Sequence, residues 1–285
     1  MFNYILYKIG SFIALSLPLK AAYRLAIFIS DINYFFAYKD RRAVKENLMS
    51  IFPHKPPREI CRIRLSMFRN FAKYLVDFFR FSELGSGYVA KNVRFENAHL
   101  LDEGLSKGKG VIIVTAHIGN WELGGVACAI LGYPIWAVAL PHKHKKVDDF
   151  FNAQRENRGL KVIPLGKAAR MCLSVLSENK ILALVGDRDF NENNLVLDFF
   201  GRPTYLPRGP ALLALKTGSV IVPGFTLRNQ DDTFTVRFDS PIEVDPSGES
   251  EKVLRALVNS YKTIIESYIS RYPDQWFMFR RYWIP

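Results

Sequence analysis

A β-branched apolar run, Gly110-Val-Ile-Ile-Val-Thr-Ala116, leads directly into the polar stretch His117-Ile-Gly-Asn-Trp-Glu122. Such a run predicts a strand that is buried on both faces, as in a parallel sheet. Gly119 permits a tight turn after this strand, and a helix is predicted over residues 121–131. Because ligands bind at the carboxyl ends of the strands in open α/β sheets, His117 stands where chemistry is expected.

The same alternation of strand and helix continues along the chain. Further strands are predicted over residues 134–140, 161–164, 181–185 and 219–227, and residues 233–238 alternate like an edge strand. Further helices are predicted over residues 58–81, 146–158, 168–178, 209–216 and 251–272. This order predicts an α/β domain with a mostly parallel sheet flanked by helices.

Residues 2–38 form the most apolar segment, but charged residues interrupt it. A membrane-spanning helix needs about 20 consecutive apolar residues. The longest uncharged run extends from Ile9 to Leu19 and contains Pro18. We therefore expect two helices separated near Pro18, the second over residues 21–36, and neither a spanning helix nor a cleaved signal peptide. A basic cluster follows, made of Lys39, Arg41, Arg42 and Lys45.

Apolar helices beside a basic cluster suit insertion into the headgroup region of an anionic membrane. The alternative is that these helices belong to the core of the globular domain. On the first interpretation, residues 1–45 form a membrane-associating segment, and residues 46–285 form the second domain.

Composition narrows the choice of partners. The chain has 39 Lys and Arg against 27 Asp and Glu, a formal charge of +12, and 49% of its residues are hydrophobic. So much apolar surface excludes a disordered chain. Three separated cysteines predict no disulfide framework and fit a reducing compartment. The charge favours an anionic partner, but basic residues are spread along the chain without a nucleic-acid-binding signature, so we do not expect nucleic acid.

The spacing of His117 and Glu122 suggests a pair for acid–base chemistry. Glu122 falls in the first turn of the predicted helix, from which a side chain can fold back toward the strand end. A carboxylate bonded to imidazole sets its tautomer and stabilises the imidazolium. We therefore expect a His117–Glu122 hydrogen bond, with His117 as general base and a substrate hydroxyl as nucleophile. The competing interpretation is that the spacing arises by chance.

A metal site is not expected, because the remaining histidines offer no convincing ligand set. His142 and His144 stand among Lys143, Lys145 and Lys146, whose charges oppose a cation. No cofactor is expected either.

Several blocks in order resemble one known family. His117-Ile-Gly-Asn-Trp-Glu122 fits the H-x4-D/E motif, and Gly186-Asp-Arg-Asp189 with Phe199-Phe-Gly-Arg-Pro203 fits a second block. Leu206-Pro-Arg-Gly-Pro-Ala211 and Tyr272-Pro-Asp-Gln-Trp276 fit later blocks. Over nearly its whole length the chain resembles the lipid A biosynthesis acyltransferases, the late enzymes that add lauroyl or myristoyl chains, which are related to the glycerolipid acyltransferases.

The resemblance implies transfer of an acyl chain from acyl carrier protein or acyl-CoA to a hydroxyl of a membrane glycolipid. A lipid A precursor is the first expectation for the acceptor, as in lipopolysaccharide biosynthesis, although enzymes that acylate phosphatidylinositol mannosides carry a similar motif. A lysophospholipid is a further alternative. The resemblance also implies that His117 is the base and Glu122 its partner, and that the enzyme associates with the cytoplasmic face of the inner membrane as a peripheral or monotopic protein through its N-terminus.

Other polar residues are candidates for substrate binding. The backbone N–H groups of Gly119 and Asn120, at a helix N-terminus, are expected to bind the oxyanion. Arg155, at a basic position that the resemblance matches, and Arg188 are candidates for the phosphates of donor or acceptor. The remaining candidates are Asp187, Asp189, Arg202 and Arg208. Asp187 and Asp189 follow the strand predicted over 181–185, and the alternative for both is a salt bridge with Arg188 or Arg202.

We therefore expect a ternary mechanism in which His117 deprotonates the acceptor hydroxyl without a covalent acyl-enzyme. A non-enzymatic lipid-binding protein would explain the apolar N-terminus but gives the histidine pair no role. An α/β hydrolase is disfavoured because the sequence lacks a G-x-S-x-G turn. Oligomeric state cannot be read from the sequence.

Overall fold

The computed structural model describes residues 2–188, 195–244 and 251–284. Its main sheet contains β1 (Val93–Glu96), β2 (Val111–Thr115), β3 (Ile135–Ala139), β4 (Lys161–Pro164), β5 (Ile181–Val185), β8 (Val220–Arg228) and β9 (Phe234–Phe238). The strands are ordered β1-β9-β8-β2-β5-β3-β4. All neighbours pair in parallel except β8 and β9, which are antiparallel. The predicted α/β fold with a mostly parallel sheet is confirmed.

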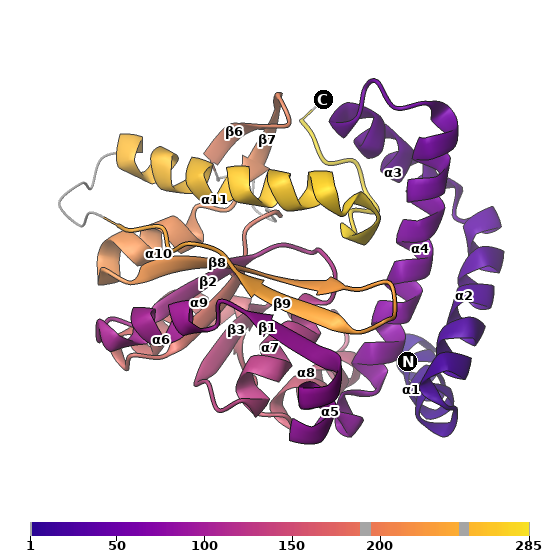
Figure 1. Cartoon of the computed structure of the whole chain (residues 1–285), viewed down its shortest axis with the longest axis horizontal. Helices are drawn as coiled ribbons and strands as arrows, with labels where there is room; N and C mark the ends of the chain where they lie inside the picture. The colour runs from indigo at the N-terminus through magenta and orange to yellow at the C-terminus, as the bar shows by residue number, and fades with distance from the viewer. Residues whose placement is uncertain (1, 189–194, 245–250, 285) are drawn as a thin grey trace.

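Helices cover both faces of the sheet, as Figure 1 shows. One face carries α5 (Ser86–Asn92), α6 (His99–Ser106), α7 (Trp121–Ile130) and α8 (Lys145–Glu156). The other carries α9 (Ala168–Ser177), α10 (Gly209–Thr217) and α11 (Glu251–Arg271). In the central strand β2, Val111 and Ile113 join the first core, whereas Ile112 and Val114 join the second. Burial on both faces explains why this strand is apolar throughout rather than alternating.

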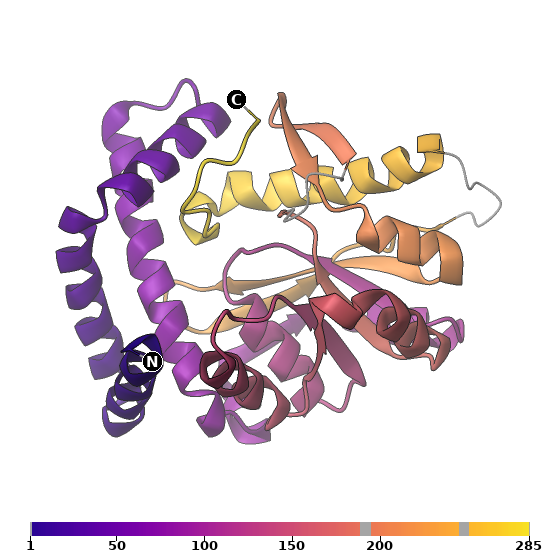
Figure 2. The same ribbon diagram turned by 180° about the vertical axis from the view of Figure 1, so that it is seen from behind.

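The N-terminal helices form a layer at one end of the sheet (Figures 1 and 2). This layer contains α1 (Phe2–Ser16), α2 (Leu19–Phe36), α3 (Tyr38–Ile51) and α4 (Pro57–Phe79). The predicted separation near Pro18 is confirmed, because Pro18 precedes the first residue of α2. The long helix α4 packs against α1, α2 and α3 and also against η3 (Pro273–Gln275) near the C-terminus. Among the described residues, no helix combines the length and apolarity that crossing a membrane requires.

Two parts of the sheet prediction were wrong. Strand β9 is not at the edge, because β1 pairs with it from the outer side. The segment before α10, expected to be a loop, contains an antiparallel hairpin of β6 (Leu195–Phe199) and β7 (Arg202–Leu206). Pro203 lies within β7, and a proline inside a short run weakens the strand signal because it cannot donate to the ladder. The short helices η1 (Phe81–Glu83) and η2 (Leu165–Lys167) complete the described elements.

Candidate active site

His117 lies beside Asp187 because their strands are neighbours in the sheet. Thr115 of β2 is in register with Val185 of β5, and both chains run in the same direction. The N–H of Gly186 donates to the carbonyl of Thr115 at 2.8 Å, which continues the pairing past the strand ends. Two residues beyond each register partner, the two side chains therefore meet at the carboxyl edge of the sheet.

The two residues form a hydrogen-bonded pair. His117 Nδ1 lies 2.8 Å from Asp187 Oδ1, and the backbone N–H of His117 donates to Asp187 Oδ2 at 3.1 Å. Trp276 Nε1 donates to the same Oδ2 at 3.0 Å. Asp187 is fully buried, whereas the His117 side chain keeps 14% of its surface exposed. Burial alone would raise the pKa of Asp187, but the charge and hydrogen bond of His117 outweigh it and hold this pKa at about 2.

This geometry assigns the imidazole tautomer. A carboxylate can only accept, so Nδ1 carries the proton and Nε2 offers its lone pair. Within the part of the chain that the structure describes, Nε2 has no hydrogen-bond partner. The ring of Trp121 meets the imidazole edge-on, with centroids 4.9 Å apart, and orients it further. His117 is thus prepared to accept a proton at Nε2 while Asp187 stabilises the resulting imidazolium.

The prediction of a hydrogen bond between His117 and Glu122 is wrong. Glu122 is bonded instead to Arg155 of α8, with Nε to Oε2 at 2.8 Å and Nη2 to Oε1 at 2.6 Å. Arg155 also donates to Asn152 Oδ1 at 3.0 Å. The first turn of α7 directs Glu122 toward α8, whereas the neighbouring strand β5 supplies the carboxylate for His117. The guanidinium of Arg155 is engaged with a carboxylate, so in this state it is not a free phosphate-binding cation.

The expected oxyanion donors are also occupied. The N–H of Gly119 donates to the carbonyl of Gln275 at 2.8 Å, and the N–H of Asn120 donates to the carbonyl of Thr226 at 2.9 Å. Gly119 has a φ of 60°, and an added Cβ would lie 1.9 Å from the oxygen of Thr226. Backbone hydrogen bonds therefore hold the turn after β2 to β8 and to the C-terminal segment, and these two amides are occupied by protein carbonyls.

Asn120 has a structural role in addition. Its side chain is buried, its Oδ1 accepts from the N–H of Leu123 as the N-cap of α7, and its Nδ2 donates to Asp77 Oδ2 at 2.9 Å. An asparagine at this position satisfies one of the free N–H groups of the first helical turn. Asn120 was predicted to contact the substrate, but its Oδ1 and its Nδ2 are each bonded to a group of the protein.

The remaining predicted residues are scattered. Arg188 lies next to Asp187 and donates through Nη2 to the carbonyl of Phe277, whose own N–H donates to the carbonyl of His117 at 2.9 Å. Arg202 is distant from this cluster, donating to Ser50 Oγ at 2.6 Å and lying 5.4 Å from the ring centroid of Trp283. The structure also places Arg208 in an exposed position at the start of α10. Asp189 lies outside the described residues.

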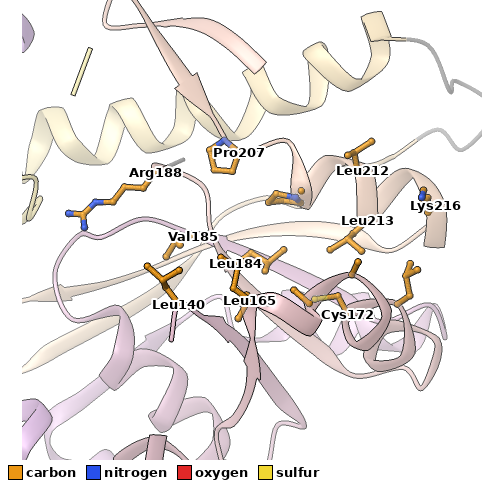
Figure 3. Close-up of a pocket in the computed structure, with 16 residues that line it drawn as sticks. Leu140, Leu165, Cys172, Leu184, Val185, Arg188, Pro207, Leu212, Leu213 and Lys216 are labelled. Carbon is orange, nitrogen blue, oxygen red and sulfur yellow. The ribbon is translucent and has the colours of Figure 1, made fainter. Parts of the chain in front are cut away.

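An apolar cavity of about 390 Å³ opens beside this site. Figure 3 shows Arg188 at one end of its lining and Lys216 at the other, with aliphatic side chains between them. The lining comes from β3, β5, α9 and α10, and its apolar members include Leu140, Leu165, Leu184, Leu212 and Leu213. Sequence patterns could not reveal this cavity, because each of these residues is a normal member of its own strand, loop or helix.

Arg188 is a polar side chain in the cavity lining and directly follows Asp187 in the chain. Its Nε is buried without a hydrogen-bond partner among the described residues. A buried donor without a partner is uncommon and calls for a functional or structural reason.

Comparison with known proteins defines the class: the chain is an α/β acyltransferase. More narrowly, residues 1–284 match the family described as bacterial lipid A biosynthesis acyltransferase, and the chain belongs to that family. It is 28% identical to a phosphatidylinositol mannoside acyltransferase of Mycolicibacterium smegmatis over 81% of this chain and 75% of the relative. A protein of that name from Mycobacterium tuberculosis is 26% identical over 90% and 81%. A lipid A biosynthesis acyltransferase of Haemophilus influenzae is 23% identical over 84% and 74%.

Proposed function

We propose that this enzyme transfers a fatty acyl chain from a thioester of acyl carrier protein or coenzyme A to a hydroxyl group of a membrane glycolipid. The observation that carries the proposal is the hydrogen-bonded His117–Asp187 pair at the carboxyl edge of the sheet, beside an apolar cavity. The cavity suits a hydrocarbon chain, because burying each methylene contributes about 0.8 kcal/mol. The pair suits deprotonation of an alcohol.

The proposed reaction is a direct displacement. Nε2 of His117 takes the proton of the acceptor hydroxyl as its oxygen bonds to the thioester carbonyl carbon. The negative charge moves to the carbonyl oxygen and then returns as the carbon–sulfur bond breaks. The leaving thiolate takes the proton from the imidazolium, so the enzyme ends in its starting state. Asp187 stabilises the imidazolium throughout, since its low pKa keeps it ionised at neutral pH.

Arg188 is the candidate donor for the developing oxyanion in place of the occupied amides. Its unpartnered Nε and its place in the cavity lining, next to Asp187 in the chain, support this role. A covalent intermediate on the cavity thiol is disfavoured, because burial raises the pKa of Cys172 to about 11 and keeps it protonated. Within this proposal Glu122 and Arg155 hold each other and support the wall of the site.

The acceptor has two candidates. A lipid A precursor follows from the family to which the chain belongs and from the relative in Haemophilus influenzae. A phosphatidylinositol mannoside is favoured by the higher identity to the mycobacterial relatives. Parallel assays with each glycolipid and one acyl thioester would distinguish them, since only the true acceptor should give a product that gains one acyl chain by mass spectrometry.

We also propose that α1 and α2 seat the enzyme on the cytoplasmic face of the inner membrane. Large apolar side chains on these helices face solvent, including Phe12, Phe28, Phe35 and Phe36 at 62–81% exposure. Further exposed large apolar residues of α1 and α2 are Ile5, Leu6, Ile9, Ile29 and Ile32. So large an apolar surface, next to the basic start of α3, matches the interface of an anionic bilayer.

The decisive test of the reaction is His117→Ala in the purified enzyme, with an acyl thioester and whichever of the two glycolipids gains an acyl chain in the parallel assays. We expect the rate of transfer to fall by about a hundredfold or more, the usual contribution of general-base catalysis. Turnover near the wild-type level, or a stable acyl-enzyme trapped without acceptor, would overturn the mechanism. Arg94→Ala is the control, because Arg94 is an exposed residue of β1 and should leave the rate of transfer unchanged.

A further inference from the structure

A second polar cluster is buried where the N-terminal helices meet the sheet. Asp77 of α4 and Arg228 at the end of β8 form an ion pair whose side chains are 2% and 6% exposed. Tyr23 of α2 donates its hydroxyl to Asp77 Oδ1 and accepts from Arg228 Nη1 at 3.2 Å. Asn120 Nδ2 donates to Asp77 Oδ2 at 2.9 Å. We call Tyr23, Asp77, Arg228 and Asn120 the buried relay.

The charge states within the relay are set by its surroundings. Burial and the adjacent Asp77 carboxylate raise the pKa of Tyr23, so its hydroxyl stays protonated and donates. The Arg228 guanidinium lies over the rings of Tyr23 and Phe234, with distances of 5.1 and 4.7 Å to their centroids. Each member thus has its partners within the protein, and the cluster is closed to a ligand.

The relay holds the catalytic turn from two sides. Asn120 connects it directly to the start of α7, three residues after His117. Through the backbone, the N–H of Arg228 donates to Gln275 Oε1 at 2.9 Å, and Gln275 Nε2 donates to the Arg228 carbonyl at 2.9 Å. The carbonyl of the same Gln275 accepts from the N–H of Gly119 at 2.8 Å. The geometry of residues 117–120 therefore depends on the seating of Arg228 and Asp77.

Stability alone is a weak reason for such a cluster. The desolvation of a buried ion pair offsets much of its attraction, and apolar side chains of similar size often stabilise a core as well or better. An ion pair with directed hydrogen bonds also restricts its side chains to a single arrangement. Here that arrangement includes a side chain from α2, the helix whose opposite face exposes Phe28, Phe35 and Phe36.

We infer that the relay is a positioning device that couples the seating of α2 to the turn carrying His117. When α2 is held on α4 by a lipid surface, Tyr23 secures Asp77, and Asp77 secures Asn120 and the start of α7. The inference rests on the proposed function, since it gives the membrane interface a way to act on the general base. It assigns Tyr23, Asp77 and Arg228 as positioning residues that touch no substrate.

The test is Tyr23→Phe, which keeps the ring and removes only the hydroxyl. Its matched control is Tyr34→Phe, on the same helix and facing the same α4, where the hydroxyl accepts from Arg64 Nε at 2.7 Å. Both variants lose one hydrogen bond between the two helices, but only the first loses its connection to the turn. Hydrogen exchange of the peptide spanning residues 117–123 is measured by mass spectrometry, with and without vesicles containing anionic lipid.

We expect Tyr23→Phe to speed exchange in this peptide by about tenfold or more, because the hydroxyl loses its hydrogen bonds to two charged groups, Asp77 and Arg228. Vesicles should slow exchange in the wild type and in Tyr34→Phe and have little effect in Tyr23→Phe. Turnover should follow the same order, with kcat reduced about fivefold to tenfold in Tyr23→Phe and KM for the acyl thioester unchanged.

A second variant, Asn120→Ser, perturbs the relay at the hydrogen bond between Asn120 and Asp77. Serine still caps the helix, so the N–H of Leu123 keeps a partner while the bond to Asp77 is lost. It should speed exchange as Tyr23→Phe does. If both tyrosine variants show the same exchange over residues 117–123, the relay is only structural and the inference fails. Because exchange does not depend on substrate, that failure is separate from the failure of the proposed reaction, which His117→Ala reports.

Discussion

Asp187, and not the carboxylate five residues after the histidine, is the side chain that polarises His117. Asp187→Asn should therefore lower kcat by about a hundredfold or more, because an amide cannot stabilise the imidazolium. Steady-state kinetics with an acyl thioester would measure this loss. Glu122→Gln should have a much smaller effect on kcat for each folded molecule, since Glu122 does not touch the imidazole. The reverse order of the two variants would contradict the assignment.

At these residues, the sequence predicts the position of the histidine but not its partner. His117 was identified because it follows a buried strand, and this position is confirmed. Its partner could not be chosen from the sequence, since pairing Asp187 with His117 requires knowing that β5 lies next to β2. Spacing favoured Glu122 only because it is near in the chain. The relay was missed for the same reason, as Tyr23 and Arg228 are 205 residues apart.

Breaking the Glu122–Arg155 pair should change the free energy of unfolding. Both side chains are nearly buried, at 13% and 10% exposure. Removing one partner leaves an unpaired buried charge, so Glu122→Leu should lower the free energy of unfolding by about 3 to 5 kcal/mol. The double variant with Arg155→Met should recover most of that loss. Urea titration followed by circular dichroism measures both. Asp149→Leu, which breaks an exposed pair with Lys145, is the control and should change stability little.

Urea titrations at decreasing pH should also reveal how the His117–Asp187 pair contributes to the free energy of unfolding. The pKa of Asp187 is about 2 in the fold against 3.8 for the free side chain. A lowered pKa contributes stability above the unfolded value and loses it as pH falls through the folded value. The Asp187 carboxylate should therefore contribute stability that is present above about pH 4 and is lost as the pH falls toward 2. In Asp187→Asn the free energy of unfolding should fall less steeply over this window, and superimposable profiles would contradict the prediction.

At the scale of elements, the turn between β2 and α7 tolerates only glycine at position 119. Any Cβ there meets the carbonyl of Thr226, and the φ of 60° is unfavourable for other residues. Gly119→Ala should push the turn off β8 and abolish most activity, while lowering the melting temperature by several degrees. Gly166→Ala is the control, because an added Cβ there meets no atom within 4 Å. Thermal unfolding and transfer assays on both variants test this prediction. Equal melting temperatures and equal rates of transfer in the two variants would contradict it.

Sequence periodicity predicted the strands and helices of the sheet layers because each has a clear apolar pattern. The strand over 181–185 and the helix that ends near Phe79 are examples. Strand β1 was missed because four residues, Val93-Arg-Phe-Glu96, are too few to establish alternation. It is this strand that moves β9 from the edge to an inner position. The N-terminal helices were predicted from apolarity and Pro18, but their packing on α4 is a tertiary property.

The exposed apolar face of α2 predicts the binding of lipid vesicles. Phe35 and Phe36 are 75% and 81% exposed, and burying one phenylalanine contributes about 1.5 to 3 kcal/mol. Replacing both with Ser should weaken binding to vesicles containing anionic lipid by tenfold or more, measured by co-sedimentation. Leu131→Ser is the control, because Leu131 is half exposed but follows α7. Equal binding by the double variant and the wild type would contradict a role for α2 at the membrane.

For the molecule as a whole, which has a net charge of +12, salt should affect the exposed charges and the buried pairs differently. The His117–Asp187 hydrogen bond and the ion pairs Glu122–Arg155 and Asp77–Arg228 are buried, at 0–14% side-chain exposure, so salt should screen them little. Exposed basic residues act over the Debye length, which falls from about 10 Å at 0.1 M salt to about 3 Å at 1 M. Salt should therefore weaken the encounter with anionic partners without disturbing the His117–Asp187 pair.

The prediction is that raising salt from about 0.1 M to 1 M lowers binding to anionic vesicles, and the transfer rate on them, by tenfold or more. On vesicles of neutral lipid, binding rests on the apolar face of α1 and α2 and should change little with salt. The melting temperature should stay the same across the series, since the buried pairs persist. If salt lowered transfer equally on both kinds of vesicle, with binding unchanged, the charge would act on the acyl donor and not on the membrane.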